Sequence, residues 1–98
     1  MKTLELLPGD RAEEASQILK ALSSPRRLMI ACRLADGEAT VGTLAACLGA
    51  RESVVSQHLA VLRRERLVSA RRDGQSVHYA LKSDAARDIL GALARSFC

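Results

Sequence analysis

The stretch RESVVSQHLAVLRRERL, residues 51–67, decides the fold of this chain. Its apolar side chains recur at the spacing of one helix face, and they are Val54, Val55, Leu59, Leu62 and Leu67. Polar side chains suited to hydrogen bonding lie on or near the opposite face, and they are Ser53, Ser56, Gln57 and His58. Such groups match the donors and acceptors that base edges present in the major groove of DNA.

The neighbouring residues support a helix that meets DNA. Arg63, Arg64 and Arg66 place positive charge at the end of the stretch, where it suits backbone phosphates. Upstream, the short apolar segment 41–48 ends at Gly49, a residue that permits a left-handed helix cap. Two helices joined by a tight glycine-containing turn are typical of a helix-turn-helix. Two amphipathic helices also meet in domains that bind no DNA, so the downstream sequence is needed.

Residues 68–81 predict a β-hairpin. Apolar and polar residues alternate on both sides of Asp73-Gly74, and Asp-Gly is a strong short-range hairpin signal. The tip carries two arginines followed by polar residues, namely Arg71, Arg72, Gln75 and Ser76. An exposed hairpin tip is often basic for no special reason. Beside a reading helix, however, it suits a wing that contacts phosphates or the minor groove.

The remaining chain completes a small helical domain. Periodicity predicts a first helix over 11–22 and a second that starts at Ser24-Pro25 and ends near residue 35. Thr40 is predicted to cap the third helix and Ser83 the last one. We expect residues 1–10 to form a flexible arm and residues 11–98 a single domain for DNA binding and dimerisation. The predicted fold class is mainly α with a small β-hairpin: a winged helix-turn-helix of five helices, with the wing before the last helix.

Composition narrows the class of function. The 98 residues are 48% hydrophobic and 27% charged, with a net charge of +4. Five arginines and one acid lie between Arg63 and Arg72, which favours a nucleic acid as partner. We expect a cytoplasmic protein without a membrane partner, because no apolar run approaches about 20 residues and no secretory segment is visible. Paired catalytic carboxylates and glycine-rich phosphate loops are also absent, so we expect no enzyme and no cofactor.

The order of elements and several motifs resemble the ArsR/SmtB family of dimeric winged-helix repressors. The matching segments are LKALSSPRRLMIACRLADGE (19–38), VGTLAACLG (41–49) and VVSQHLAVLRRERLVSARRDGQSVHYAL (54–81), followed by the closing helix. The resemblance covers residues 15–98. It implies a homodimer formed by the first and last helices, with two reading helices in successive major grooves of an imperfectly palindromic operator. It also implies that Ser53, Ser56, Gln57 and His58 face bases, and that Arg71, Arg72, Gln75 and Ser76 form the wing contacts.

Many members of this family sense metals, but this chain lacks their motifs. Thr40 and Gly42 stand where the third helix often carries a Cys-x-Cys pair. The last helix, residues 83–98, contains no histidine and no glutamate. A soft-metal site needs three or four converging ligands. We therefore expect no metal site.

Cys32 in the second helix and Cys98 at the end of the last helix instead resemble the persulfide-responsive BigR/SqrR/HlyU branch. In that branch, two thiols become linked through extra sulfur atoms and repression is relieved. The resemblance implies a sensor of reactive sulfur species, and we expect Cys32 to attack first and Cys98 to resolve. We interpret Cys47, among apolar neighbours, as a packing residue. Two alternatives use the same thiols to sense arsenite or another metalloid, or peroxide. A third is a winged-helix module that binds protein or RNA without catalysis.

Overall fold

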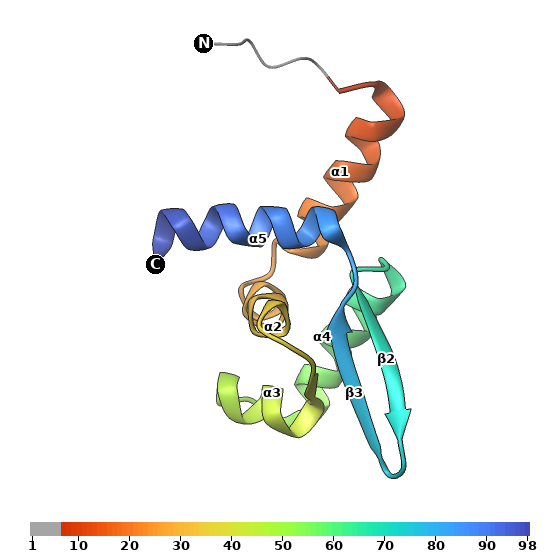
Figure 1. The fold of residues 1–98 in the computed structure, drawn as a ribbon, viewed down its shortest axis with the longest axis vertical. Coiled ribbons are helices and arrows are strands. Elements are labelled where there is room, and N and C mark those ends of the chain that lie inside the picture. Colours follow the sequence, from red (N-terminus) through yellow and green to blue (C-terminus); the bar gives the residue numbers. More distant parts are fainter. Residues whose placement is uncertain (1–6) are drawn as a thin grey trace.

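The computed structural model describes residues 7–98. Helix α1 (Gly9–Ala21) is followed by α2 (Pro25–Ala35), the short strand β1 (Ala39–Thr40), α3 (Val41–Leu48) and α4 (Glu52–Arg64). The chain continues with β2 (Val68–Asp73), β3 (Ser76–Leu81) and α5 (Asp84–Phe97) (Figure 1). The described residues confirm the predicted fold class, five helices with a wing before the last one.

The predicted N-terminal arm is only partly covered by the structure. Residues 1–6 lie outside the described residues, and residues 7 and 8 belong to no helix or strand. Gly9 and Asp10 already lie in α1, so the first helix starts two residues earlier than the predicted residue 11. The reason is that Pro8 precedes the helix as its N-cap, and the Pro8 carbonyl accepts from the amide of Ala12 at 2.8 Å.

Side-chain caps start three of the helices, as their sequences predict. The hydroxyl of Ser24 accepts a hydrogen bond from the Arg27 amide at 3.4 Å, ahead of Pro25 in the first turn of α2. Thr40 caps α3 in the same way at 3.2 Å. Ser83 caps α5 by accepting from the amide of Ala86 at 3.0 Å. Each cap satisfies an amide that has no partner within its own helix.

The hairpin forms, and it recruits a strand that the sequence patterns did not predict. Strand β3 pairs with β2 on one side and with the two-residue β1 on the other, both antiparallel, in the order β1-β3-β2. The turn is also one residue later than expected, because Asp73 pairs with Ser76 and leaves Gly74 and Gln75 as the loop. Gly74 has φ 61°, as the first loop position of a type II′ turn requires.

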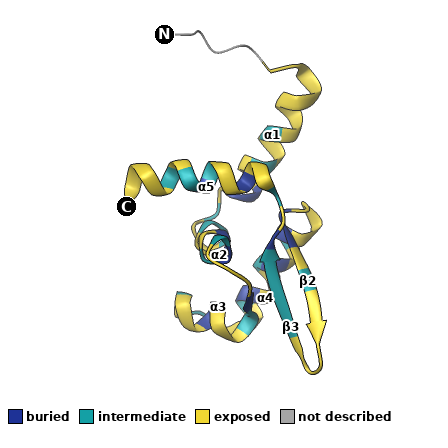
Figure 2. Cartoon of the chain, viewed as in Figure 1, coloured by how far each residue is buried: buried dark blue, intermediate teal, exposed yellow. Residues whose placement is uncertain are grey.

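The core lies where α2, α3 and α4 meet the inner ends of the hairpin and α5. Its largest fully buried side chains include Ile30, Leu34, Leu44, Leu59 and Leu62. By contrast, α1 extends away from this body and is mostly exposed, as is the far end of α5 (Figure 2). The apolar face predicted for the first helix is therefore buried only near Leu22, whereas Leu19 stays 55% exposed. Across residues 7–98, none of the helices has the length and apolar character needed to cross a bilayer.

Candidate nucleic-acid interface and thiol pair

A left-handed turn sets the start of α4. Gly49 has φ 62° and ψ 37°, and the Ala50 amide donates back to the carbonyl of Ala45 at 3.0 Å. This geometry ends α3 and redirects the chain within three residues. Arg51 then occupies the N-cap without a side-chain cap bond, while its carbonyl accepts from the amides of Val54 and Val55 at 3.1 Å. The glycine turn and the backbone thus define where α4 begins.

Helix α4 is shorter than the stretch 51–67 suggests. It ends at Arg64, and Arg66 adopts φ 64°. The Leu67 amide donates to the carbonyl of Leu62 at 2.9 Å, and the Arg66 amide donates to that of Arg63 at 3.0 Å. This pair of bonds is the Schellman arrangement, which closes the helix and sends the chain into β2.

One face of α4 is buried and the opposite face is open. Val55, Leu59 and Leu62 lie in the core. The exposed residues of the helix include five that the sequence assigns to DNA, namely Ser53, Ser56, Gln57, Arg63 and Arg64. The outer face therefore offers hydroxyl and amide groups near the N-terminus and two guanidinium groups near the C-terminus. Those are the groups that base edges and phosphates can bind.

His58 does not share this outer face. It is half-buried, and it lies near enough to α2 for the charges of that helix to act on it. Burial lowers the pKa of His58, and the positive charges of Arg27 and Arg26 on α2 lower it further. The imidazole therefore stays neutral more readily than a free histidine. Its helical position lies nearer the buried stripe than the centre of the exposed face, so the structure gives no support to the predicted base contact.

The wing carries its four predicted residues at the surface. Arg71, Arg72, Gln75 and Ser76 are all exposed. Arg71 forms an ion pair with Glu38 in the loop before β1, and its guanidinium also lies 3.9 Å from a carboxylate oxygen of Asp73. Within residues 7–98, Arg72 has no ion pair. Arg72 is therefore the less restrained of the two guanidinium groups.

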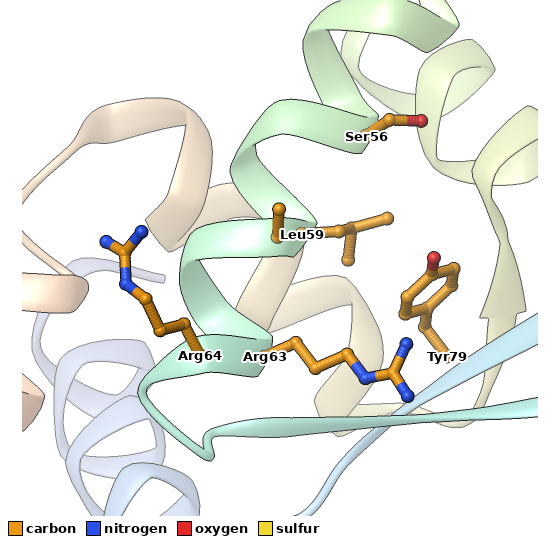
Figure 3. Close-up of a pocket in the computed structure, with 6 residues that line it drawn as sticks. Ser56, Leu59, Arg63, Arg64 and Tyr79 are labelled. Carbon is orange, nitrogen blue, oxygen red and sulfur yellow. The ribbon is translucent and has the colours of Figure 1, made fainter.

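A groove separates α4 from the sheet. It has a volume of about 380 Å³ and is lined by Ser56, Leu59, Ala60, Arg63, Arg64 and Tyr79. In Figure 3 the Arg63 side chain extends from α4 toward Tyr79, whereas the Arg64 guanidinium points to the other side of the helix. Tyr79 was not among the predicted site residues. The sequence places Tyr79 in the second strand of the predicted hairpin, but it does not show which residues the ring faces.

The three cysteines are free thiols, and all three are exposed. The interpretation of Cys47 as a packing residue was therefore wrong, because Cys47 is exposed whereas its neighbours Leu44 and Ala45 are buried. Cys32 lies in α2, and Cys98 is the C-cap of α5, where its amide donates to the carbonyl of Ala94 at 2.9 Å. Helices α2 and α5 pack against each other.

Cys32 and Cys98 are close enough for the charge of one to affect the other. Burial raises the pKa of the Cys32 thiol, and the negative charges of Cys98 and Asp36 raise it further. The raised pKa lowers the thiolate fraction of Cys32 at neutral pH. It therefore counts against the predicted order in which Cys32 attacks first. Among residues 7–98, no group of three or more histidine, cysteine or acidic side chains is placed to hold a metal ion.

Three features together define a winged-helix DNA-binding protein. They are the helix-turn-helix, the exposed polar face of α4 and the adjacent wing. Comparison with known proteins agrees. Residues 24–70 match the model of the family described as "Bacterial regulatory protein, arsR family". The nodulation protein NolR of Rhizobium meliloti is 45% identical over 94 residues, which are 93% of this chain and 77% of that protein.

Solved structures of similar fold include regulators that are about 40% identical to this chain. Reduced HlyU from Vibrio cholerae has a TM-score of 0.87 at 40% identity, covering 91% of this chain and 94% of the other. The transcriptional repressor BigR from Xylella fastidiosa has a TM-score of 0.86 at 39% identity, covering 91% of each. A more distant relative, a homodimeric winged helix-turn-helix domain from Mycobacterium bovis, has a TM-score of 0.78 at 26% identity, covering 95% of this chain and 89% of the other. The chain belongs to the ArsR family, and HlyU and BigR are among its relatives.

Proposed function

We propose that this protein is a homodimeric transcriptional repressor that releases its operator when reactive sulfur species bridge Cys32 and Cys98. The observation that carries the sensing half is a pair of exposed thiols on two packed helices, with the charge of Cys98 acting on Cys32. The DNA-binding half is supported by the family, the outer face of α4 and the exposed wing. Relatives of the chain are named as a repressor and as a transcriptional regulator, which favours this function over catalysis.

Apolar surface left open in the single chain supports the dimer. Leu19 on α1 is 55% exposed and Phe97 on α5 is 83% exposed. In Figure 1, α1 extends away from the other elements and has no neighbour along most of its length. Apolar helix faces of this kind are covered when a second chain packs against them. The homodimeric relative from Mycobacterium bovis has the same architecture.

Two reading heads imply a two-part operator. A dimer with a twofold axis presents its two α4 helices to half-sites about one helical turn apart, on the order of 10 base pairs. In each head, Gln57 lies on the exposed face of α4, where its amide can bind a base edge in two places. We expect Gln57→Ala to weaken operator binding by about 1–3 kcal/mol, measured by fluorescence anisotropy.

The proposed bridging reaction needs no oxidant besides the sulfur compound. One cysteine thiolate attacks the central sulfur of an organic trisulfide, R–S–S–S–R, and expels RS⁻. The second thiolate attacks the same sulfur and expels the second RS⁻, which leaves Cys32 and Cys98 joined through one added sulfur atom. The two cysteines are oxidised by two electrons, the trisulfide is reduced to two thiolates, and two thiol protons pass to solvent. A bridge of three sulfurs also spans more than a disulfide does.

The bridge would act on DNA through α2. This helix packs against α5 on one side and against α3 and α4 on the other. Tying α2 to the end of α5 would change how the reading head sits or moves relative to the dimer helices. An effector shifts such an equilibrium only by its different affinity for the two states. The bridge forms only where the thiols can approach, so it favours the arrangement that brings them together.

The test combines mass spectrometry with DNA release. Operator DNA is first selected from a random duplex library, which should return an imperfect palindrome. Treatment with an organic trisulfide should then join the peptides of Cys32 and Cys98, with the mass of one sulfur atom added and two hydrogens lost, and should release the DNA. Cys32→Ser should bind DNA and resist release. Cys47→Ser is the matched control, since its thiol is exposed elsewhere, and it should behave as the wild type.

The alternatives give different products in the same experiment. A plain disulfide formed by peroxide with equal release would favour a peroxide sensor, and an arsenic adduct on both thiols would favour a metalloid sensor. Loss of DNA binding in untreated Cys32→Ser would assign that thiol to packing. A chain that selects no duplex sequence and binds RNA or protein instead would overturn the repressor altogether.

A further inference from the structure

The groove between α4 and β3 brings residues already proposed to contact DNA next to Tyr79, a polar residue that the proposed DNA contacts leave unused. Its lining contains the hydroxyl groups of Ser56 and Tyr79 and the Arg63 guanidinium, which extends toward Tyr79, but no carboxylate (Figure 3). Within residues 7–98, neither Arg63 nor Arg64 forms an ion pair, and the Tyr79 hydroxyl takes part in none of the side-chain hydrogen bonds. The groove therefore presents donors and positive charge, which suits an anion.

The sheet explains why Tyr79 is available. Tyr79 lies on the central strand β3, where its cross-strand partners are Ala39 on β1 and Ala70 on β2. Directly paired residues share one face of a sheet. With two alanines as its cross-strand partners, the tyrosine ring has no bulky side chain directly paired with it. The ring is half-buried against this surface and lines the groove opposite Leu59 of α4.

The position of the groove indicates which anion would occupy it. If α4 enters a major groove and the hairpin tip meets the adjacent minor groove, the sugar–phosphate strand that divides the two grooves must pass between α4 and the wing. The groove lies between the same two elements. Ala60 leaves room for a backbone strand on the α4 side of the groove, because it is exposed and its side chain is a single methyl group.

We propose that this groove seats one phosphate of the DNA backbone, and that the Tyr79 hydroxyl donates a hydrogen bond to it alongside Ser56 and Arg63. The proposal rests on the proposed DNA-binding function and adds a contact that anchors α4 and the wing to one strand. Tyr79 would act as a positioning contact without reading sequence. It therefore contributes to affinity for any duplex that the protein grips in this mode.

The first test removes only the hydroxyl. Tyr79→Phe keeps the ring on the sheet and should weaken binding to the selected operator about tenfold, the usual loss for a hydrogen bond to a charged group. Ser56→Ala should weaken binding in the same direction. Ser69→Ala is the matched control, because Ser69 is exposed on β2 and shares the opposite sheet face with Arg71. It should bind as the wild type does. Thermal unfolding checks that each variant is folded.

The second test locates the phosphate. Operators that carry a single neutral methylphosphonate are scanned through each half-site. A methylphosphonate at one backbone position should weaken DNA binding by the wild type. The same modification should weaken binding by Tyr79→Phe much less, because that variant has already lost the contact. The chain has one tyrosine, so incorporated fluorotyrosine gives a single fluorine resonance, and that resonance should shift with normal DNA and not with this modified DNA.

The outcomes separate the two levels of proposal. Wild-type protein that binds no duplex overturns the proposed function itself. A different result overturns the phosphate seat and leaves the repressor intact. In that result the wild type binds its operator, folded Tyr79→Phe binds it with equal affinity, and no methylphosphonate position distinguishes the two proteins.

Discussion

The same substitution at two glycines, one inside α3 and one directly after it, should have opposite effects on stability. Gly49 follows α3 with φ 62°, a conformation that L-residues adopt at a cost of about 1–2 kcal/mol. Gly49→Ala also restricts the unfolded chain, which returns about 0.4–1 kcal/mol. Nothing lies within 4 Å of a Cβ added there, so no clash contributes. The expected net loss in the free energy of unfolding is about 1 kcal/mol.

Gly42, at the other end of the helix, provides the control. It has no positive φ, and a Cβ added there would lie 3.8 Å from Thr40 Oγ1 and 3.9 Å from Glu52 Oε2, which are ordinary contacts. Gly42→Ala should therefore stabilise the protein by about 0.5–1 kcal/mol through lower helix entropy cost. The two variants should differ by about 1.5–2 kcal/mol, on the sum of these two estimates.

Urea unfolding followed by far-UV circular dichroism measures both variants. The protein concentration is kept constant, because association with a second chain adds to apparent stability. The reasoning is refuted if both alanines move the midpoint in the same direction by similar amounts. That result would mean that the α3–α4 turn relaxes without its left-handed residue. In that case Gly49 would not set the start of α4.

Three further predictions concern charge. Arg72→Ala should weaken DNA binding and lower the slope of the binding constant against salt concentration by about one. Arg71→Ala should have a smaller effect, because Glu38 already pairs with Arg71. Equal slopes for the two variants in a salt titration would contradict this ranking. Burial, Cys98 and Asp36 raise the pKa of Cys32, so Asp36→Asn should lower that pKa. When the alkylation rate of Cys32 is measured against pH, the midpoint should move to lower pH. An unmoved midpoint counts against a role for Asp36. The pKa of His58 is lowered by folding, so its neutral form favours the folded state, and stability should fall as pH drops from the ordinary histidine pKa of about 6.5 toward the lower folded value. His58→Gln should flatten that part of the pH–stability curve, and a curve identical to wild type would argue against this linkage.

Local chemistry accounts for most of what the sequence predicted correctly. The caps Ser24, Thr40 and Ser83 bond to amides three residues away, so the chain itself shows where these helices start. Gly49 marks the α3–α4 turn for the same reason, since the conformation it permits depends on one residue. Periodicity identified the buried and open faces of α4 because a helix repeats its geometry along its length.

The tertiary structure decided the features that depend on residues far apart in the chain. The two-residue strand β1 carries too little pattern to be recognised, and it exists because β3 offers an unpaired edge. That pairing surrounds Tyr79 with alanines and shapes the groove. The direction of His58 depends on where α2 lies, and the closeness of Cys32 and Cys98 depends on how α2 packs against α5.

Cysteine exposure shows the limit of sequence reasoning most clearly. Cys47 sits among apolar residues of α3, yet its thiol is exposed, because one face of so short a helix meets the core and the rest does not. The amino-acid sequence by itself determined the capped starts of α2, α3 and α5, the hairpin and the family. Which side chains meet one another was decided only by packing, because contacts between distant residues arise from the sum of many weak burial terms that no local pattern records.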